Sequence, residues 1–217
     1  MKFLLCLFFW GCLHAQAQPD SLLLTKNFKF NDGVYMQFAD FQKNKPTFTW
    51  AELNARMVTS DEGFVAQVEY LKNDLQVIDL QQVWGICIEG IPYIQLKETQ
   101  KENRAARFAS LRVRGKICYF SFPKEVTEMV EIKAYNPLNG RPYRSSRIPV
   151  EKIEIQEQML DFQTGEIAAF TKENFMQWIA DDPQLWNTVK DLSPSETEEK
   201  LFKCLLIYVD RNNVYLR

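Results

Sequence analysis

The sequence contains a single histidine in 217 residues, and this residue, His14, lies in a segment that we expect to be removed. The working protein then lacks imidazole, the side chain that most often serves as catalytic base or metal ligand. Without histidine there can be no Ser-His-Asp triad, no Cys-His pair and no HExxH zinc helix. Glycine-rich phosphate loops, calcium-loop patterns and CxxC pairs are also missing, so we expect no metal and no cofactor.

Long hydrophobic runs are also scarce, and the one at the start of the chain covers only residues 3–13. A bilayer span needs about 20 apolar residues. The run follows Lys2 and precedes the small-x-small pattern Ala15-Gln16-Ala17, as in a secretory signal peptide. We therefore expect a signal peptide over residues 1–17 and an exported protein without a transmembrane span, in the periplasm, on the cell surface or secreted. The alternative is a lipoprotein acylated at Cys12, which the bulky residues before that cysteine disfavour.

Cysteine is scarce as well, because removal of the leader leaves only Cys87, Cys118 and Cys204. An odd number of this size excludes a scaffold built on disulfides, so a hydrophobic core must hold the fold. Export permits one bridge, and Cys87 with Cys118 is the candidate pair because both lie in predicted strands. The preferred interpretation is that all three are buried thiols acting as small apolar side chains.

The remaining composition, with 46% hydrophobic and 25% charged residues, is that of an ordinary globular protein. The leader carries one basic residue and no acid, so the mature chain has 25 basic and 28 acidic residues and a net charge of −3. This balance does not indicate a nucleic-acid partner.

Strand patterns dominate residues 18–150, which we predict to be an antiparallel β-rich region. Three glycine-containing turns between apolar runs predict hairpins; these turns are Asp32-Gly33, Glu89-Gly90 and Arg114-Gly115. Strands are also expected over residues 131–135 and 152–162. Residues 136–149 are rich in Pro, Gly, Ser and Arg, which predicts a long loop and a domain boundary near residue 150.

The hairpin at Arg114-Gly115 is expected to form one core face. The residues on that face are Ala109, Leu111 and Val113 from one strand and Cys118, Phe120 and Phe122 from the other.

Residues 151–217 are predicted to form a β-hairpin followed by two to three helices, packed on the same domain. The hairpin turns at Gln163-Thr164-Gly165. Thr171, Asp182-Pro183 and the capping box Ser193-Pro194-Ser195-Glu196 each mark a helix start. Strands first and helices last give an α+β fold, with a barrel- or sandwich-like antiparallel part.

Several of these segments resemble uncharacterised exported proteins of Bacteroidota-type bacteria. They are the block from Gly33 to Pro46, the Val83-Trp84-Gly85 hairpin, the Leu160 to Gly165 turn and the stretch from Phe170 to Phe175. The resemblance covers most of the mature chain in order, and the first block is its most specific part. Because the family has no assigned activity, the resemblance implies export and a shared fold, and it assigns no functional residue.

Basic residues are more clustered than acidic ones, and Arg107, Arg112 and Arg114 are the candidate ligand-binding residues, called here the arginine group. Arginine matches carboxylates, sulfates and phosphates. The partner classes that follow are an anionic glycan, a lipid headgroup or an acidic envelope protein. The alternative is an ordinary solvated surface. Three further arginines lie in the predicted loop: Arg141, Arg144 and Arg147.

The sequence therefore predicts an exported, non-catalytic binding or structural module of the cell envelope. The alternative is a carboxylate-dependent glycan hydrolase, because that chemistry needs only two acids beside a cleft. Acids in or near predicted strands are Glu69, Asp79, Glu89 and Glu131.

Overall fold

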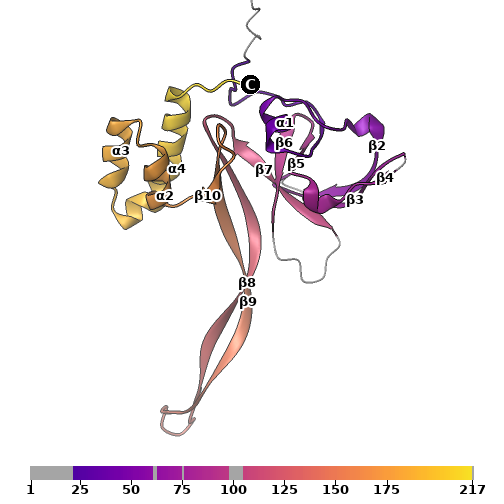
Figure 1. The fold of residues 1–217 in the computed structure, drawn as a ribbon. Helices are drawn as coiled ribbons and strands as arrows, with labels where there is room; N and C mark the ends of the chain where they lie inside the picture. The colour runs from indigo at the N-terminus through magenta and orange to yellow at the C-terminus, as the bar shows by residue number, and fades with distance from the viewer. Residues whose placement is uncertain (1–21, 61–62, 75, 98–104, 217) are drawn as a thin grey trace, which may run out of the picture.

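The structure, a computed structural model, describes residues 22–60, 63–74, 76–97 and 105–216. A β-rich head, a C-terminal helical part and a long two-stranded arm make up the molecule (Figure 1). The expected signal peptide and Cys12 lie outside the described residues.

The strands are β1 (Gly33–Tyr35), β2 (Leu53–Thr59), β3 (Val65–Asn73), β4 (Gln76–Val77), β5 (Gly85–Ile88), β6 (Ile91–Gln95), β7 (Ala106–Val113), β8 (Ile117–Tyr135), β9 (Pro142–Asp161) and β10 (Ile167–Ala169). The helices are α1 (Phe38–Gln42), α2 (Lys172–Trp178), α3 (Pro183–Lys190) and α4 (Pro194–Arg211), with short 3-10 turns η1 (Trp50–Glu52) and η2 (Leu80–Gln82).

All the strands belong to one antiparallel sheet that curls into a half-barrel. Its main path runs in the order β1-β5-β6-β7-β8-β9-β10, and β3 joins the side of β7 while also pairing with β2 and β4. The predicted α+β class, with antiparallel strands first and helices at the end, is thus confirmed.

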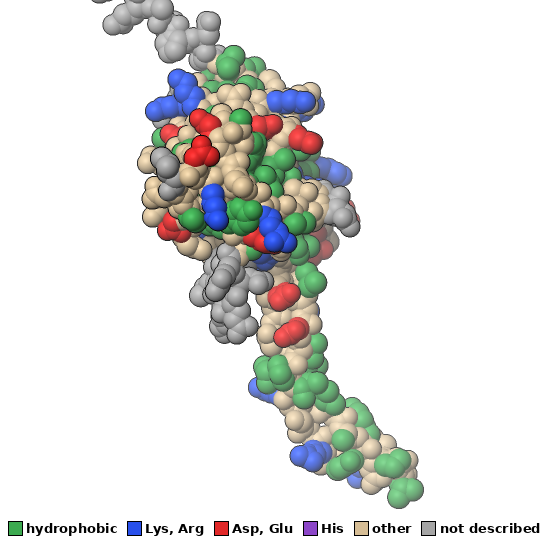
Figure 2. All heavy atoms as spheres, turned by 90° about the vertical axis from the view of Figure 1, so that its right-hand side faces the viewer, with side chains coloured by type: hydrophobic (Ala, Val, Ile, Leu, Met, Phe, Trp, Pro, Cys, Tyr) green, Lys and Arg blue, Asp and Glu red, His purple; other side chains and the backbone are tan. Residues whose placement is uncertain are grey.

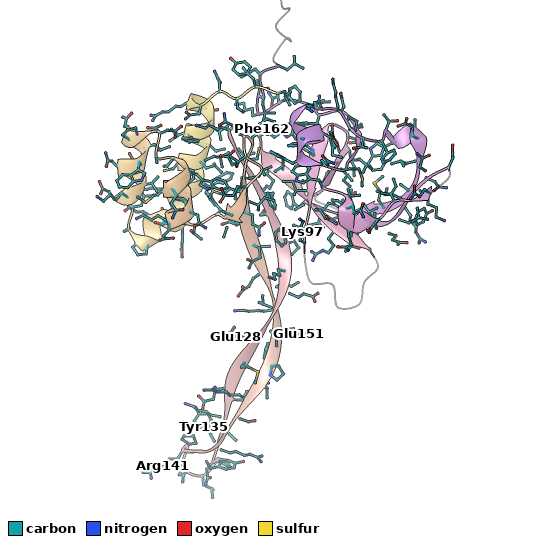
Figure 3. The ribbon with its side chains drawn as sticks, in the orientation of Figure 1. Lys97, Glu128, Tyr135, Arg141, Glu151 and Phe162 are labelled. Carbon is teal, nitrogen blue, oxygen red and sulfur yellow. The ribbon has the colours of Figure 1, made fainter. Side chains whose placement is uncertain are left out.

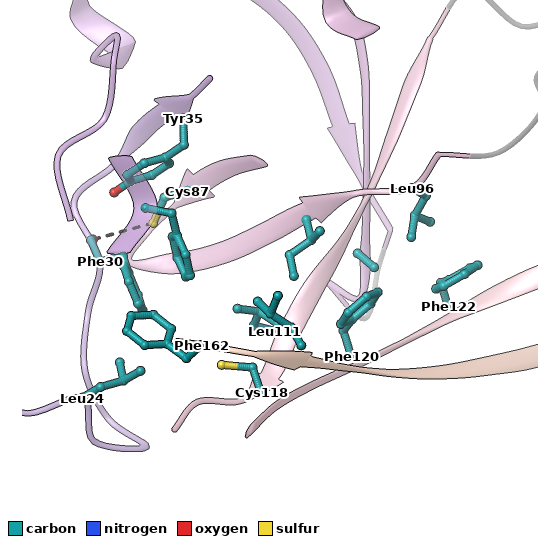
Figure 4. Packing of buried hydrophobic residues seen from close by; sticks show 14 of the residues in the cluster. Leu24, Phe30, Tyr35, Cys87, Leu96, Leu111, Cys118, Phe120, Phe122 and Phe162 are labelled. Atoms are coloured by element: carbon teal, nitrogen blue, oxygen red, sulfur yellow. Dashed lines mark hydrogen bonds between the residues drawn. The ribbon is translucent and has the colours of Figure 1, made fainter. Parts of the chain in front are cut away.

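The proximal end of β8 lies between two hydrophobic cores, because successive side chains of a strand point to opposite faces. Cys118, Phe120 and Phe122 pack into the core formed with the N-terminal segment and α1 (Figure 4). Ile117 and Tyr119 pack on the other face, against the C-terminal helices. This double burial fixes the register of β8 where it leaves the head.

The hairpin predicted at Glu89-Gly90 is confirmed as β5 and β6. Both turn residues have positive φ, 54° at Glu89 and 79° at Gly90, as a tight two-residue turn requires. The prediction of a hairpin at Asp32-Gly33 is wrong. The Asp32 carboxylate accepts a hydrogen bond from Gly90 N, and Val34 pairs with Ile86, so this segment joins β5 instead of folding on itself.

The expected face of the Arg114-Gly115 hairpin is correct except at one position. Leu111 lies opposite Phe120, but the register shifts before Val113, which pairs with Tyr119. This irregularity turns Val113 to the opposite face, where it packs against the C-terminal helices.

Helices begin at all three of the predicted starts, with the expected caps. The side chains of Thr171, Asp182 and Ser193 accept hydrogen bonds from backbone amides in the first turns of α2, α3 and α4. Phe170 and Phe175 meet edge to face with ring centroids 5.7 Å apart. Among the described residues, no helix combines the length and the apolar character that crossing a membrane requires.

The prediction of a long loop over residues 136–149 is wrong. Only residues 136–141 form a turn, and the rest belongs to β9, which pairs with β8 over its whole length. The separate strands expected over residues 131–135 and 152–162 are the two ends of this ribbon. The ribbon also continues past residue 150, near the predicted boundary, without a break in its pairing. Proline is tolerated here because each strand has an open edge that needs no N–H donor.

Candidate functional site: the arm and the groove at its base

The arm is the part of the β8–β9 ribbon that projects beyond the head, residues 124–154 (Figure 3). Phe122 on β8 and Met159 on β9 are the outermost ribbon residues in the hydrophobic cores. Residues 123–158 are all described, and not one of their side chains is buried. The arm is therefore held together by its own ladder, without a core behind it.

One face of the arm carries β-branched apolar side chains in neighbouring positions, although water covers it. Val130 lies directly opposite Ile148, and the adjacent Ile132 and Val150 point to the same face. Their exposed fractions lie between 39% and 48%. We call these four residues the apolar patch. Cross-strand pairs of this kind stabilise a ribbon, and they also present a surface that water solvates poorly.

Closer to the head, the same face carries a small ion-pair network. Lys152 Nζ lies 2.7 Å from a carboxylate oxygen of Glu128 and 2.9 Å from one of Glu154. The hydrogen bond from Lys152 lowers the pKa of Glu128. All three side chains are well exposed, so this network contributes little to stability.

A hydrogen-bonded turn closes the arm. Asn136 N donates to the carbonyl of Arg141, and Gly140 N donates to the carbonyl of Asn136. The Asn136 side chain also accepts from Leu138 N. Gly140 adopts φ 65°, a conformation that glycine provides without strain. These bonds place Leu138 at the apex with 93% of its surface exposed.

The arm tip, residues 131–147, combines large apolar groups with positive charge (Figures 2 and 3). Tyr135 and Tyr143 flank the turn and are 58% and 72% exposed. The charged side chains of the tip are Glu131, Lys133, Arg141, Arg144 and Arg147, a net charge of +3. Lys133 Nζ lies 3.8 Å from a carboxylate oxygen of Glu131. The three arginines form no ion pair with the described residues.

The sequence pattern predicts these three arginines in a loop, whereas the structure places Arg144 and Arg147 on β9. The signal that could have revealed the arm is the alternation of apolar and polar residues over 130–134 and again over 153–156. Residues 142–149 show no such alternation, and their prolines and serines concealed the strand.

A groove with a volume of about 1450 Å³ lies between the base of the arm and the head. Side-chain amides form much of its wall, with Gln81, Gln82 and Gln95 among them. Trp84 also lines the groove, and its ring stacks on the ring of Phe41 with centroids 4.8 Å apart.

The arginine group does not form one site. Arg107 Nη2 donates to the carbonyl of Pro123 across the groove wall. Arg112 stacks over the ring of Phe64 at 4.6 Å, and Arg114 Nη1 donates to the carbonyl of Phe28 at 2.6 Å. Strand alternation places Arg107 and Arg112 on opposite faces of β7. The guanidinium groups therefore bind separate parts of the head, and an anionic ligand for the group stays a prediction.

The three cysteines of the described chain are free and buried. The Cys87 thiol contacts the Phe30 carbonyl and the Asp32 carboxylate, whereas the Cys118 thiol donates to the Gly115 carbonyl. Figure 4 shows Cys87 and Cys118 at separate places in the same core. Burial raises the pKa of Cys118 to about 12.

The acids considered for hydrolysis are scattered over the molecule. Glu69 pairs with Arg56 at 3.2 Å, Asp79 caps η2, and Glu89 occupies the β5–β6 turn. Glu131 lies on the arm. Among the described residues that line the groove, Glu125 is the single carboxylate, whereas hydrolysis of this type needs two.

Comparisons with protein-family models, curated proteins and solved structures found no match to this chain.

Proposed function

We propose that this protein is an exported, non-catalytic binding module of the cell envelope and that the arm is its binding element. The observation that carries this proposal is the ribbon itself, which projects with exposed apolar side chains and no buried residue over 123–158. Export is supported by the leader pattern at residues 1–17.

A two-stranded ribbon is marginally stable in water because it buries little apolar surface. A chain that only needed to connect Phe122 with Met159 could do so with a short turn. The arm instead extends for many residues and exposes the apolar patch, Leu138 and two tyrosines. Contiguous exposed apolar surface on a soluble protein usually marks an interaction site.

The charge of the arm tip indicates an anionic partner. Its net charge of +3 contrasts with a mature chain of net −3, so the positive charge is concentrated where the molecule projects furthest. Lipid headgroups, acidic glycans and acidic envelope proteins share the negative charge that such a tip attracts.

The test compares the mature protein with an arm-shortened variant in which residues 126–152 are replaced by Asn-Gly. Both are incubated with washed envelope membranes of a Bacteroidota bacterium and sedimented, after circular dichroism has shown that both are folded. We expect the mature protein to sediment and the arm-shortened variant to remain in the supernatant. Equal sedimentation of the two proteins would refute the arm as the binding element.

A further inference from the structure

We propose that the arm tip binds the headgroup layer of an anionic lipid bilayer and inserts Leu138 at the boundary with the acyl chains. This inference rests on the proposed function and names the partner of the arm. It follows from the shape of the tip, from the positions of its aromatic residues and from the distribution of charge over the molecule.

The apex is convex and apolar. Leu138 is 93% exposed at the end of a hydrogen-bonded turn, so the backbone that presents its side chain outward is already ordered. A protruding leucine needs either a fitted pocket in a partner or a fluid apolar phase. The bilayer supplies such a phase without a complementary shape, and transfer of one leucine into it strengthens binding about tenfold or more.

The two tyrosines lie one step behind the apex, on opposite strands. Tyr135 ends β8, and Tyr143 is the second residue of β9, so both flank the turn that carries Leu138. Tyrosine is enriched at membrane interfaces because its ring is apolar and its hydroxyl stays hydrated. This order of leucine first and tyrosines next matches the polarity gradient that a tip meets when it enters a headgroup layer.

The basic residues follow the same gradient. Arg141 lies in the turn, and Arg144, Arg147 and Lys133 continue back along both strands. A basic residue close to an anionic leaflet strengthens binding about five-fold. Three arginines together are thus expected to contribute about a hundred-fold.

The rest of the molecule has the opposite charge. The mature chain has a net charge of −3 and the tip has +3, so the remaining residues carry −6. Nine ladder steps, from Phe122 to Glu131, separate the head from the tip, roughly 30 Å at 3.4 Å per residue. This separation exceeds the screening length of about 8 Å at physiological salt. An anionic surface therefore attracts the tip and repels the head, which orients the arm toward the bilayer.

A lipid surface fits these observations better than an acidic glycan or an acidic protein. A hydrated glycan offers no apolar phase for Leu138. A protein partner would need a pocket fitted to a single apex residue.

The test uses the mature protein and sedimentation with vesicles of phosphatidylcholine alone or with 30% phosphatidylglycerol, at 0.1 M salt. We expect binding to the anionic vesicles, at least tenfold weaker binding to the neutral ones, and a loss of binding as salt rises. L138D is expected to weaken binding at least tenfold, and the triple variant R141Q/R144Q/R147Q about a hundred-fold. The matched control is V77D, which places a new acid at another exposed apolar position, on β4, and is expected to bind as the unaltered protein does.

The outcomes separate this inference from the proposed function. Sedimentation with envelope membranes that depends on the arm, without binding to anionic vesicles, would overturn the lipid partner and leave the arm as the binding element. In that case polygalacturonate and poly-glutamate serve as probes for an acidic glycan and an acidic protein. Vesicle binding that L138D and the arginine variant leave unchanged would also overturn the inference. Loss of both kinds of binding would overturn both proposals.

Discussion

Removal of the arm should leave the stability of the head unchanged, whereas truncation of one side chain at its base, Phe120, should lower that stability. In the arm-shortened variant, Asn-Gly joins Glu125 to Ile153, which lie directly opposite each other in the ladder. None of the deleted side chains is buried or belongs to a hydrophobic core, so the deletion removes no core contact from the head. The ladder hydrogen bonds that are lost are opposed by the ordering cost of the same backbone. We expect the free energy of unfolding to change by less than about 1 kcal/mol.

Phe120 supplies the contrast. Its side chain is 1% exposed and packs in the core that the curled sheet forms with the N-terminal segment. Phe120→Ala removes most of an aromatic side chain from a close-packed site and is expected to cost about 3 to 5 kcal/mol. That loss is a large part of the 5 to 15 kcal/mol by which domains of this kind are stable.

Urea unfolding followed by circular dichroism measures both variants on one scale. The slope of free energy against urea reports the surface exposed on unfolding, and it should change little when the arm is removed. A loss of more than about 2 kcal/mol in the arm-shortened variant would show that the arm helps to hold the head together. The arm would then be a structural part of the head and not a projecting binding element.

Three further predictions concern the head and the helices. Burial alone would raise the pKa of Asp181, but hydrogen bonds from Lys116 and Tyr208 outweigh it and lower the pKa below the ordinary value of 3.8. The ionised Asp181 side chain therefore stabilises the folded protein at neutral pH, and this stabilisation disappears as the pH falls below about 4. Asp181→Asn is expected to cost up to about 1 kcal/mol at pH 7, because the carboxylate is half exposed, and nothing at pH 2; equal losses at both pH values in thermal melts would contradict this. Thiol titration of the folded mature protein at pH 8 should be slow, because burial raises the pKa of Cys118 to about 12, and urea should reveal three thiols; fewer than three would indicate a bridge. Replacing the arginine group with alanine should lower the salt needed to elute the protein from an anionic glycan matrix if the group binds anions, and elution at unchanged salt would exclude that site.

Local patterns in the sequence predicted the elements that local chemistry decides. Capping residues such as Ser193 fixed the helix starts, and Glu89-Gly90 fixed a hairpin, because both signals act within a few residues. Prediction failed where a distant partner competed with the local pattern. Gly90 N binds the Asp32 carboxylate, and this contact over 58 residues removed the hairpin expected at Asp32-Gly33.

The sequence alone determined the α+β class and the composition of the C-terminal helices, and it showed the histidine-poor chemistry of the chain. Only the tertiary structure decided that residues 131–147 form the end of an arm. Pairing between Val130 and Ile148 joins residues 18 positions apart, and a proline- and serine-containing run becomes a strand only when its partner supplies the hydrogen bonds. The same pairing brings Tyr135, Leu138 and Arg144 to one exposed end. No single segment carries that information, because a ladder specifies each strand through the other.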